Sequence, residues 1–377
     1  MRIAFYAPLK APTHPVPSGD RRMARLLMTA LAEGGHRVEL ACALRSHDRG
    51  DPARQARLRD LGERAAGLLL RRYARQPERR PEAWFTYHLY HKAPDWIGPA
   101  VSAALGIPYV VAEASFAPKR ATGPWALGHA AAEAALRRAD AVLHLTTVDA
   151  ECLAPVVRPG RLVAFPPFLD EAPYAAAAER RPDLRDAWAA RLGLPADAPW
   201  LLAVGMFREG DKLASYRVLG EALPRLRDRP WRLIVCGAGP AEAAVRAALA
   251  GLPAEAVRWA GALEPDDLAT LYAACDLMVW PAVNEAYGMA LLEAQAAGLP
   301  VVAGRTLGVP DVVADGETGR LAPVGDAAAF AAAVAALLDD PAGRLAFGAA
   351  ARRRVAAHHA FPVAVGRLNA VLAAAAR

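Results

Sequence analysis

Apolar and polar positions along the first half of the chain follow the pattern of repeated strand and helix units. Residues 21–33 have the spacing of a helix with one apolar face, formed by Met23, Leu26, Leu27 and Leu31. Short apolar runs before and after this helix predict strands at 3–7, 38–43, 83–87, 109–112, 141–146 and 162–165. Strands that alternate with helices predict a mostly parallel, doubly wound α/β sheet.

A second series of such units begins near residue 200. Residues 182–200 are rich in proline and alanine and interrupt the alternation. New strands are expected after this segment, at 200–205, 232–236, 257–259, 277–280 and 301–303. The boundary between the two series is expected near residue 190.

We therefore expect three parts in the chain. They are a Rossmann-like N-terminal domain over 1–190, a Rossmann-like C-terminal domain over 191–360, and a helix over 361–377 that packs back on the N-terminal domain. Two doubly wound domains would face each other across a cleft at the carboxyl ends of their strands, where such sheets bind ligands.

Composition agrees with a globular protein of two domains. The chain has 377 residues, of which 54% are hydrophobic and 22% are charged, which is enough apolar material for two cores. It has neither a secretory pattern at its start nor a run of about 18 apolar residues, so we expect a cytoplasmic protein without a membrane-spanning helix. The four cysteines lie far apart, and we expect reduced thiols and no zinc site.

Positive charge gathers in the N-terminal half. Residues 1–198 hold 28 Lys and Arg against 21 Asp and Glu, whereas residues 199–377 hold 17 against 18. Many of the arginines interleave with leucines in one stretch, at Arg54, Arg57, Arg59, Arg64, Arg71, Arg72, Arg75, Arg79 and Arg80. This pattern fits either a solvated arginine face or a basic amphipathic helix that contacts an anionic acceptor or the inner face of an anionic membrane.

The most informative stretch is residues 284–302, which read NEAYGMALLEAQAAGLPVV. Glu285 lies on the loop after an expected strand, and Gly288 opens a helix whose exposed N–H groups and dipole would suit nucleotide phosphates. Glu293 lies five residues beyond Gly288 and would look into the same pocket from deeper down. The alternative is an ordinary helix with two surface glutamates, since glutamate near a helix start is favoured in any case.

This stretch resembles the E-x7-E motif of the retaining GT-B glycosyltransferases of glycosyltransferase family 4, the glycosyl transferases group 1. Glu285 and Glu293 stand in the two acidic positions, and the glycine between them matches too. The resemblance implies a donor nucleotide sugar in the C-terminal domain, with Glu285 on the sugar hydroxyls and Glu293 on the ribose hydroxyls. Tyr287 and Met289, on either side of Gly288, are expected to line the donor site.

A second charged loop, VGMFREGDKL at residues 204–213, follows the first strand of the C-terminal domain. Lys212 as a point charge and Arg208 as a fork would neutralise a diphosphate as it leaves. The loop resembles the family's donor diphosphate loop, but Met206 stands where an arginine usually follows the glycine. Solvated loop charges are the alternative.

A third glycine turn, VCGAGP at residues 235–240, also follows an expected strand. Gly237 resembles the family's glycine turn in the nucleotide-binding domain, and a tight strand-to-helix connection explains it equally well.

The N-terminal half resembles the family by architecture. Gly19 lies between the first strand and the first helix, where glycine lets a substrate approach the backbone, and we expect it to contribute to binding of the donor nucleotide sugar. His88 ends an expected strand and either binds the acceptor or donor sugar or is a packed or surface histidine. Many relatives carry a sugar-contacting histidine after the strand at 109–112, whereas this chain reads AEAS at residues 112–115, where Glu113 would take over part of the site.

Together these features indicate a retaining, hexosyltransferase-type enzyme that moves a sugar from a UDP- or GDP-sugar to a glycan, lipid-linked or other hydroxyl acceptor, as in polysaccharide biosynthesis. Glu285, Lys212 and Arg208 are the expected catalytic residues. No cofactor, metal or nucleic acid partner is expected, because lysine, arginine and backbone dipoles serve the diphosphate and no DxD-type cluster follows a strand.

Two alternatives remain from other classes of protein. The missing histidine is compatible with a nucleotide-sugar-binding protein without transferase activity. A dinucleotide-dependent oxidoreductase would carry G-x-G-x-x-G in its first turn, which residues 7–19 do not.

Overall fold

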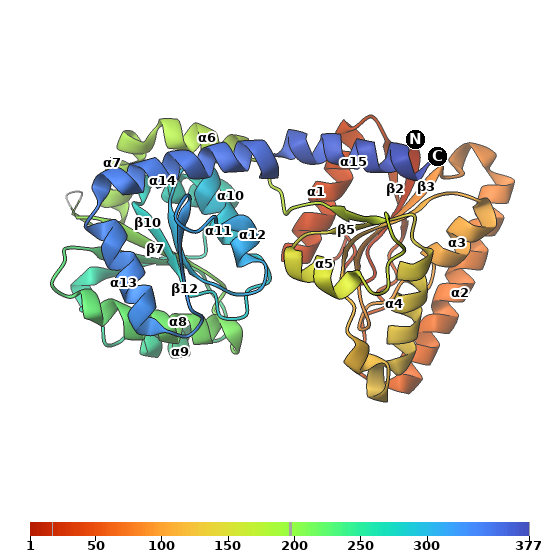
Figure 1. Ribbon diagram of the computed structural model, residues 1–377, viewed down its shortest axis with the longest axis horizontal. Helices are drawn as coiled ribbons and strands as arrows, with labels where there is room; N and C mark the ends of the chain where they lie inside the picture. Colours follow the sequence, from red (N-terminus) through yellow and green to blue (C-terminus); the bar gives the residue numbers. More distant parts are fainter. Residues whose placement is uncertain (17, 196–197, 377) are drawn as a thin grey trace. The chain divides into compact units, whose positions relative to one another are not determined.

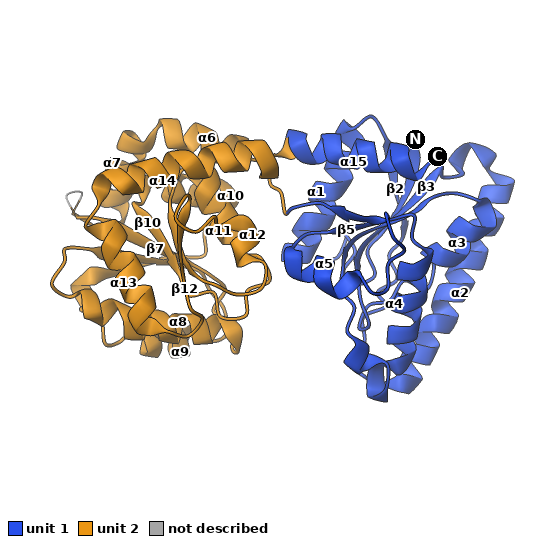
Figure 2. Ribbon diagram, in the orientation of Figure 1, with its two compact units in different colours: residues 1–166, 362–377 blue, residues 167–361 orange. Residues whose placement is uncertain are grey.

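The computed structural model describes residues 1–16, 18–195 and 198–376 and divides the chain into two compact units (Figures 1 and 2). Unit 1 comprises Met1–Pro166 and the chain from Pro362 onward, and unit 2 comprises Pro167–Phe361. Each unit is built on one parallel six-stranded sheet with helices on both faces. The expected pair of doubly wound α/β domains is confirmed.

Unit 1 has the strand order β2-β1-β3-β4-β5-β6. Its strands are β1 (Arg2–Tyr6), β2 (Arg37–Cys42), β3 (Ala83–Leu89), β4 (Tyr109–Ala114), β5 (Ala141–His144) and β6 (Leu162–Ala164). Its helices are α1 (Gly19–Glu33), α2 (Pro52–Arg75), α3 (Gly98–Leu105), α4 (Ala126–Arg138), α5 (Thr147–Leu153) and α15 (Phe361–Ala375), with 3-10 turns η1 (Pro77–Arg79), η2 (Pro118–Arg120) and η3 (Gly123–Trp125).

The inner strands of unit 1 are apolar on both faces because helices cover the sheet from two sides. Figure 1 shows α2, α3 and α4 on one face and α1, α5 and α15 on the other. Residues along β3 and β4 are almost all buried, and Trp84 and Tyr109 anchor the core. Continuous apolar runs of this kind are typical of buried parallel strands.

Unit 2 has the strand order β12-β11-β10-β7-β8-β9. Its strands are β7 (Trp200–Val204), β8 (Arg232–Cys236), β9 (Val257–Gly261), β10 (Leu277–Trp280), β11 (Val301–Gly304) and β12 (Gly319–Ala322). Its helices are α6 (Ala172–Glu179), α7 (Arg181–Leu192), α8 (Asp211–Ala222), α9 (Glu242–Ala248), α10 (Pro265–Ala274), α11 (Met289–Ala296), α12 (Val309–Val312), α13 (Ala327–Leu338) and α14 (Pro341–Arg354), with 3-10 turns η4 (Leu223–Leu226) and η5 (Ala254–Ala256) and a π-helix, η6 (Val355–His359).

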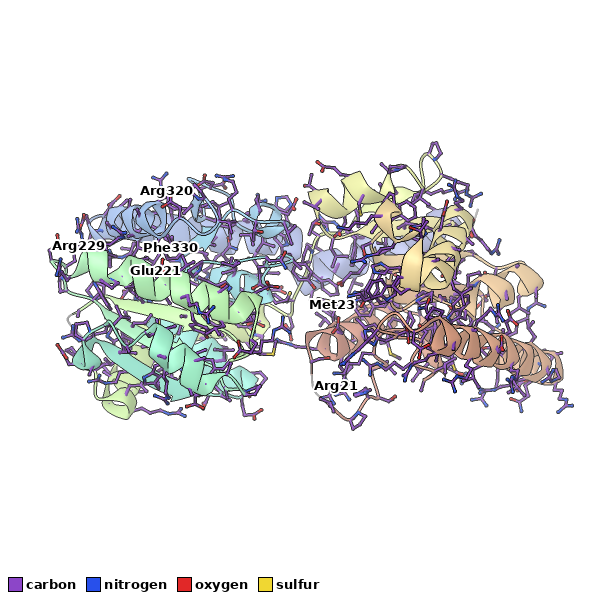
Figure 3. The ribbon with its side chains drawn as sticks, turned by 90° about the horizontal axis from the view of Figure 1, so that it is seen from below. Arg21, Met23, Glu221, Arg229, Arg320 and Phe330 are labelled. Atoms are coloured by element: carbon purple, nitrogen blue, oxygen red, sulfur yellow. The ribbon has the colours of Figure 1, made fainter. Side chains whose placement is uncertain are left out.

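The helices of unit 2 also pack on both faces of their sheet. α8, α9 and α13 lie on one face, and α6, α7, α10 and α11 lie on the other (Figure 1). Phe330 of α13 points into the core, whereas Arg320 of β12 lies at the surface (Figure 3). The core also contains Trp200 and Trp280, which come from the two central strands.

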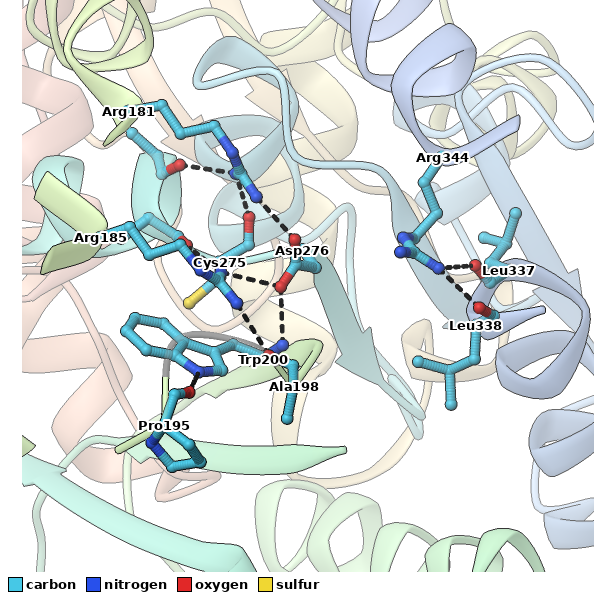
Figure 4. Close-up of polar contacts among 12 residues, drawn as sticks. Arg181, Arg185, Pro195, Ala198, Trp200, Cys275, Asp276, Leu337, Leu338 and Arg344 are labelled. Carbon is cyan, nitrogen blue, oxygen red and sulfur yellow. Dashed lines mark hydrogen bonds and ion pairs between the residues drawn. The ribbon is translucent and has the colours of Figure 1, made fainter. Parts of the chain in front are cut away.

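The boundary between the units falls at residues 166 and 167 rather than near residue 190. α6 and α7 precede the first strand of unit 2 but pack on α10 of the same unit. Arg181 and Arg185 of α7 each form an ion pair with Asp276, at 2.6 and 2.9 Å, and Asp276 also accepts a hydrogen bond from the Trp200 amide (Figure 4). These contacts fasten the segment expected at the end of the N-terminal domain to unit 2.

The C-terminal helix packs on unit 1 through polar and apolar contacts. Asn369 of α15 donates from Nδ2 to the carbonyl oxygen of Gly34 at 3.1 Å, and its Oδ1 lies 2.8 Å from His36 Nε2. Buried Leu368 and Leu372 supply the apolar face of the helix.

Within the described ranges no helix is long and apolar enough to cross a bilayer. The four cysteines, at positions 42, 152, 236 and 275, are all free.

Candidate functional site

In both sheets the strand order reverses beside the first strand of the unit. In unit 2, β7 lies between β10 and β8, and in unit 1, β1 lies between β2 and β3. Doubly wound sheets bind ligands outside the carboxyl ends of the strands that flank such a reversal. Lys212 and Glu285 follow β7 and β10, and Gly19 and His88 lie after β1 and near the end of β3, so both units place sequence-predicted residues at this point.

The loop after β10 is held in an unusual backbone conformation. Ala282 and Asn284 have φ of 53°, in the left-handed region that non-glycine residues rarely adopt. The loop is fixed to α8, because Ser215 Oγ accepts from the Val283 amide at 3.0 Å and Asn284 Nδ2 donates to Asp211 at 2.9 Å. The backbone strain is thus offset by contacts that set the direction of the loop.

Gly288 is the N-cap of α11, as the sequence predicts. Its φ is 76°, and a Cβ there would lie 2.9 Å from Leu291 Cδ1, so a side chain would be strained in two ways. Tyr287 and Met289 flank this glycine and are half-buried. The first amide groups of α11 therefore point away from the helix at the carboxyl end of β10.

Lys212 and Glu285 form an ion pair although they are far apart in the sequence. Both side chains are largely buried, with exposed fractions of 16% and 18%. Glu285 Oε2 also accepts a hydrogen bond from the indole N–H of Trp280 at 3.1 Å. The structure therefore brings the expected cation and the first expected acid into one contact. The sequence did not identify Trp280, whose position at the end of an apolar strand, five residues before Glu285, was the available signal.

Glu293 lies deeper in the fold than Glu285 and has a different partner. Its side chain on α11 is buried, and Tyr272 of α10 donates its hydroxyl proton to Glu293 Oε2 at 3.1 Å. Burial, reinforced by the Glu293 carboxylate, raises the pKa of Tyr272 well above its ordinary value. The hydroxyl thus stays protonated and holds Glu293 in a fixed orientation.

Arg208 is not brought into this contact. Its side chain is exposed and forms no hydrogen bond or ion pair within the described part of the chain, while Phe207 beside it is buried. Met206, at the position where the family usually has arginine, is 55% exposed.

Gly237 has a packing role of its own, because a Cβ there would lie 2.0 Å from the carbonyl oxygen of Gly205.

In unit 1, His88 lies between two carboxylates. Its Nδ1 is 3.1 Å from Asp20 Oδ1 and 3.4 Å from Glu113 Oε1. Asp20 follows Gly19 in the first turn of α1. Ser18 caps this helix, because its side chain accepts a hydrogen bond from the Arg21 amide. Pro17 lies outside the described residues. Asp20 was not expected at the site, although its place directly after Gly19 in the first turn is a signal in the sequence.

His88 and Glu113 occupy matching strained positions on neighbouring strands. Their φ angles are 62° and 56°, and the residues beside them pair as Tyr87 with Ala112 and Leu89 with Ala114. Strained non-glycine residues in two adjacent strands cost free energy and cluster at functional sites. This geometry is compatible with the expected role of both side chains in binding.

The two carboxylates change the titration of His88. Burial alone would lower its pKa, but Glu113 and Asp20 outweigh burial and raise the pKa above the ordinary 6.5. Burial also raises the pKa of Glu113, and the pKa of Asp20 is lowered because His88 overcomes the opposing effect of burial. The stability that protonated His88 contributes is complete below pH 6.5 and is lost as the pH rises through its folded pKa.

We expect Asp20→Asn to lower the pKa of His88, because one of the carboxylates that stabilise the imidazolium is removed. The measurement is an NMR titration of the His88 ring proton. Asp60→Asn, on α2, is the control and should leave the titration unchanged. An identical His88 pKa in wild type and Asp20→Asn would contradict the ion pair.

Within the residues that the structure describes, no group of three or more His, Cys, Asp or Glu side chains is arranged to hold a metal ion. The polar groups at the end of unit 2's central strands are instead Lys212, Glu285 and the amide groups that open α11. A cation and oriented amide groups at one edge of the sheet suit an anionic ligand with hydroxyl groups.

Unit 2 contains a stretch that is similar to a known protein family. The family model described as "Glycosyl transferases group 1" matches residues 198–340, which lie wholly in unit 2. The D-inositol 3-phosphate glycosyltransferase of Corynebacterium diphtheriae is 36% identical over 194 residues, covering 49% of this chain and 44% of that protein. The match thus spans less than half the length of this curated relative.

Solved structures share the fold of both units. A glycosyltransferase from Rickettsia africae superposes with a TM-score of 0.78 at 14% identity, covering 99% of this chain and 98% of that one. Anabaena Alr3699/HepE, solved in complex with UDP, superposes with a TM-score of 0.73 at 15% identity, covering 99% of this chain and all of the other. The chain has the GT-B fold, and residues 198–340 of its C-terminal unit match the glycosyl transferases group 1 family.

Proposed function

We propose that this chain is a retaining glycosyltransferase that transfers a sugar from a UDP- or GDP-sugar to a hydroxyl acceptor. The observation that carries the proposal is the contact of Lys212 with Glu285 at the strand reversal of a group 1 unit. UDP in the structure of the Anabaena relative supports a nucleoside diphosphate as the leaving group. A retaining outcome rests on the E-x7-E motif alone.

The donor diphosphate would bind between Lys212 and the N-terminus of α11. Lys212 extends from the first turn of α8, and Gly288 opens α11 without a side chain in the way. A fixed cation and oriented amide groups stabilise the negative charge that develops on the diphosphate as the glycosidic bond breaks. Arg208 would add a second cation by moving in from its exposed position. No divalent ion is required in this mechanism.

The two glutamates would bind the two ends of the donor. Glu285, at the mouth of α11, would accept hydrogen bonds from the sugar hydroxyls, and Glu293 would hold the ribose hydroxyls. Tyr287, Met289 and Gly237 would line the rest of the donor site. The burial of both acids supports this role, because a carboxylate shielded from water forms stronger hydrogen bonds to a ligand.

The acceptor would bind to unit 1 at His88 and Glu113. Gly19, which has open space beside its backbone, would contact the donor. The strained pair of His88 and Glu113 stands near the position of the histidine that many relatives have after β4. The relatives are named for D-inositol 3-phosphate, but their match covers half of this chain. We therefore propose only a glycan, lipid-linked or other hydroxyl acceptor.

A donor screen tests the proposed function. Binding and slow hydrolysis of UDP- and GDP-sugars are measured for wild type, Glu285→Ala and Arg229→Ala, the last being a surface control, with and without a chelator. We expect Glu285→Ala to lower turnover about 100-fold, Arg229→Ala to match wild type, and the chelator to have no effect. Turnover that Glu285→Ala leaves intact would refute the site, and donor binding without transfer or hydrolysis would indicate a binding protein instead.

We also propose that α2 contacts an anionic membrane surface at the inner face of the cytoplasmic membrane. The structure separates the leucines of this helix: Leu58 and Leu69 are buried in the core, whereas Leu61 and Leu68 are exposed. The exposed leucines share one stripe with arginines, in the order Arg57, Leu61, Arg64, Leu68, Arg71 and Arg75. Apolar and basic side chains on one helix face favour adsorption to anionic lipid.

Vesicle sedimentation tests this contact. The protein should bind phosphatidylglycerol vesicles and not phosphatidylcholine vesicles, with binding that weakens in salt. Leu61→Ser/Leu68→Ser should lower binding about tenfold or more, since each leucine loses its burial in the lipid interface. Leu345→Ser, at an exposed position of unit 2, is the matched control, and equal loss in the control would contradict the proposal.

A further inference from the structure

Trp280 is the last residue of β10, and its side chain is almost completely buried. Its indole N–H donates to Glu285 Oε2 at 3.1 Å, and Lys212 Nζ, which pairs with the same oxygen, lies 5.3 Å from the centroid of the indole ring. Glu285 Oε1 accepts no hydrogen bond from any residue that the structure describes. One oxygen of Glu285 is therefore held by the protein, and the other remains for a ligand.

The indole ring packs against Gly205, in the loop after β7, and against Tyr216 of α8. A Cβ on Gly205 would lie 2.7 Å from Trp280 Cη2, so only glycine fits against the far edge of the ring. The Tyr216 ring packs edge-on at 5.1 Å, and its hydroxyl donates to the carbonyl oxygen of Gly205 at 3.0 Å. Because the ring is confined on two sides, the direction of its N–H is fixed.

We propose that Trp280 is the positioning residue for Glu285, an inference that rests on the function proposed above. In the described structure both Lys212, through an ion pair, and Trp280, through a hydrogen bond, hold the Glu285 side chain in place. A donor diphosphate attracts Lys212 more strongly than one carboxylate does, because it carries more negative charge. Lys212 then turns to the diphosphate, and the indole N–H, which does not titrate, alone keeps Glu285 directed at the sugar.

This role separates the binding of the sugar from the binding of the nucleotide. Trp280 touches neither part of the donor in this account and acts only through Glu285. Removal of the indole N–H should therefore weaken binding of a nucleotide sugar and leave binding of the nucleoside diphosphate unchanged. A structural defect in the pocket would weaken both ligands together.

Calorimetric titration of Trp280→Phe tests the inference, with UDP and UDP-glucose as one pair of probes and GDP and GDP-mannose as the second. We expect the dissociation constant of the nucleotide sugar to rise about tenfold, the usual effect of a lost hydrogen bond to a charged group. The dissociation constant of the nucleoside diphosphate should stay unchanged. Glu285→Ala combined with Trp280→Phe should bind no more weakly than Glu285→Ala alone, because the two residues act as one unit.

Trp231→Phe is the matched control, since it also removes a buried indole N–H, which donates to the carbonyl oxygen of Leu226 at 2.9 Å, before the start of β8. Trp231→Phe should leave the dissociation constants of both the nucleotide sugar and the nucleoside diphosphate unchanged. If Trp280→Phe does not fold, Gly205→Ala, which pushes on the ring edge, replaces it with the same expectations.

The outcomes separate this inference from the proposed function. Equal weakening of both ligands, or effects that add to those of Glu285→Ala, would overturn the positioning role. If Glu285→Ala binds both ligands like wild type, or no nucleotide sugar binds to wild type, the proposed function itself fails.

Discussion

Lys212→Ala is expected to lower kcat for sugar transfer or donor hydrolysis about 100- to 1000-fold, the effect of removing one preorganised group that stabilises developing charge. Lys212 is the cation that the fold holds next to Glu285, and its side chain is only 16% exposed. Arg208 is exposed and cannot supply the same charge without moving. The donor KM should change less than kcat, because charge on the diphosphate grows in the transition state.

Two variants make this experiment specific to the position of the charge. Lys212→Arg keeps a cation in a different shape and should recover part of the activity. Arg229→Ala removes a cation from unit 2 that pairs with Asp228 and Asp339 and should leave kcat unchanged. A kcat for Lys212→Ala within a fewfold of wild type would mean that Lys212 does not serve the leaving group.

Asp276→Ala is expected to destabilise unit 2 by about 3 kcal/mol, because it leaves two arginines without their shared carboxylate. Arg181 and Arg185 both pair with Asp276, which is 16% exposed, and the Trp200 amide donates to it at 2.7 Å. Arg185 also lies over the Trp200 ring, 4.2 Å from its centroid. The loss therefore affects the attachment of α7 to the start of two central strands (Figure 4).

The loss of stability is measured by urea unfolding followed by circular dichroism. Asp339→Ala breaks an exposed ion pair with Arg229, which solvent screens, and should lower the unfolding midpoint much less than Asp276→Ala does. Asp276 precedes β10 whereas Glu285 follows it, so the two residues lie at opposite ends of this strand. Under conditions in which Asp276→Ala is folded, its donor affinity should therefore equal that of wild type. A midpoint no lower than that of Asp339→Ala would contradict the structural role of Asp276.

Apolar runs predicted the strands well because most of them are buried on both faces. Every strand expected from the sequence is present, with ends that differ by at most two residues. β12 was missed because its four residues, GRLA, include Gly319 and the exposed Arg320 and lie at the edge of the sheet. An edge strand with one covered face gives a weak apolar signal.

The domain boundary could not be read from composition. The proline- and alanine-rich segment 182–200 predicts a boundary near residue 190, but this segment overlaps α7, which carries Arg181 and Arg185. Their partners, Asp276 and carbonyl groups at the end of α10, lie some 90 residues further along the chain. Pairing over such a distance becomes visible only when the two helices are placed together.

The sequence identified the charged residues of the candidate site but not the residues that hold them in place. Lys212 and Glu285 each follow a strand, which is a local signal, and the parallel sheet brings both to one edge. Trp280 was missed because its role depends on the direction of its N–H, which Gly205 and Tyr216 fix. Leu61 and Leu68 likewise separate from Leu58 and Leu69 only when the buried face of α2 is known.

Hydrogen exchange measured by mass spectrometry, with and without UDP- and GDP-sugars, tests the central claim most directly. We predict that a bound donor slows exchange at residues 205–212 and 282–293, the two loops that carry Lys212 and Glu285. Protection confined to other segments, with these two loops exchanging as in the free protein, would contradict a donor site at this edge of unit 2.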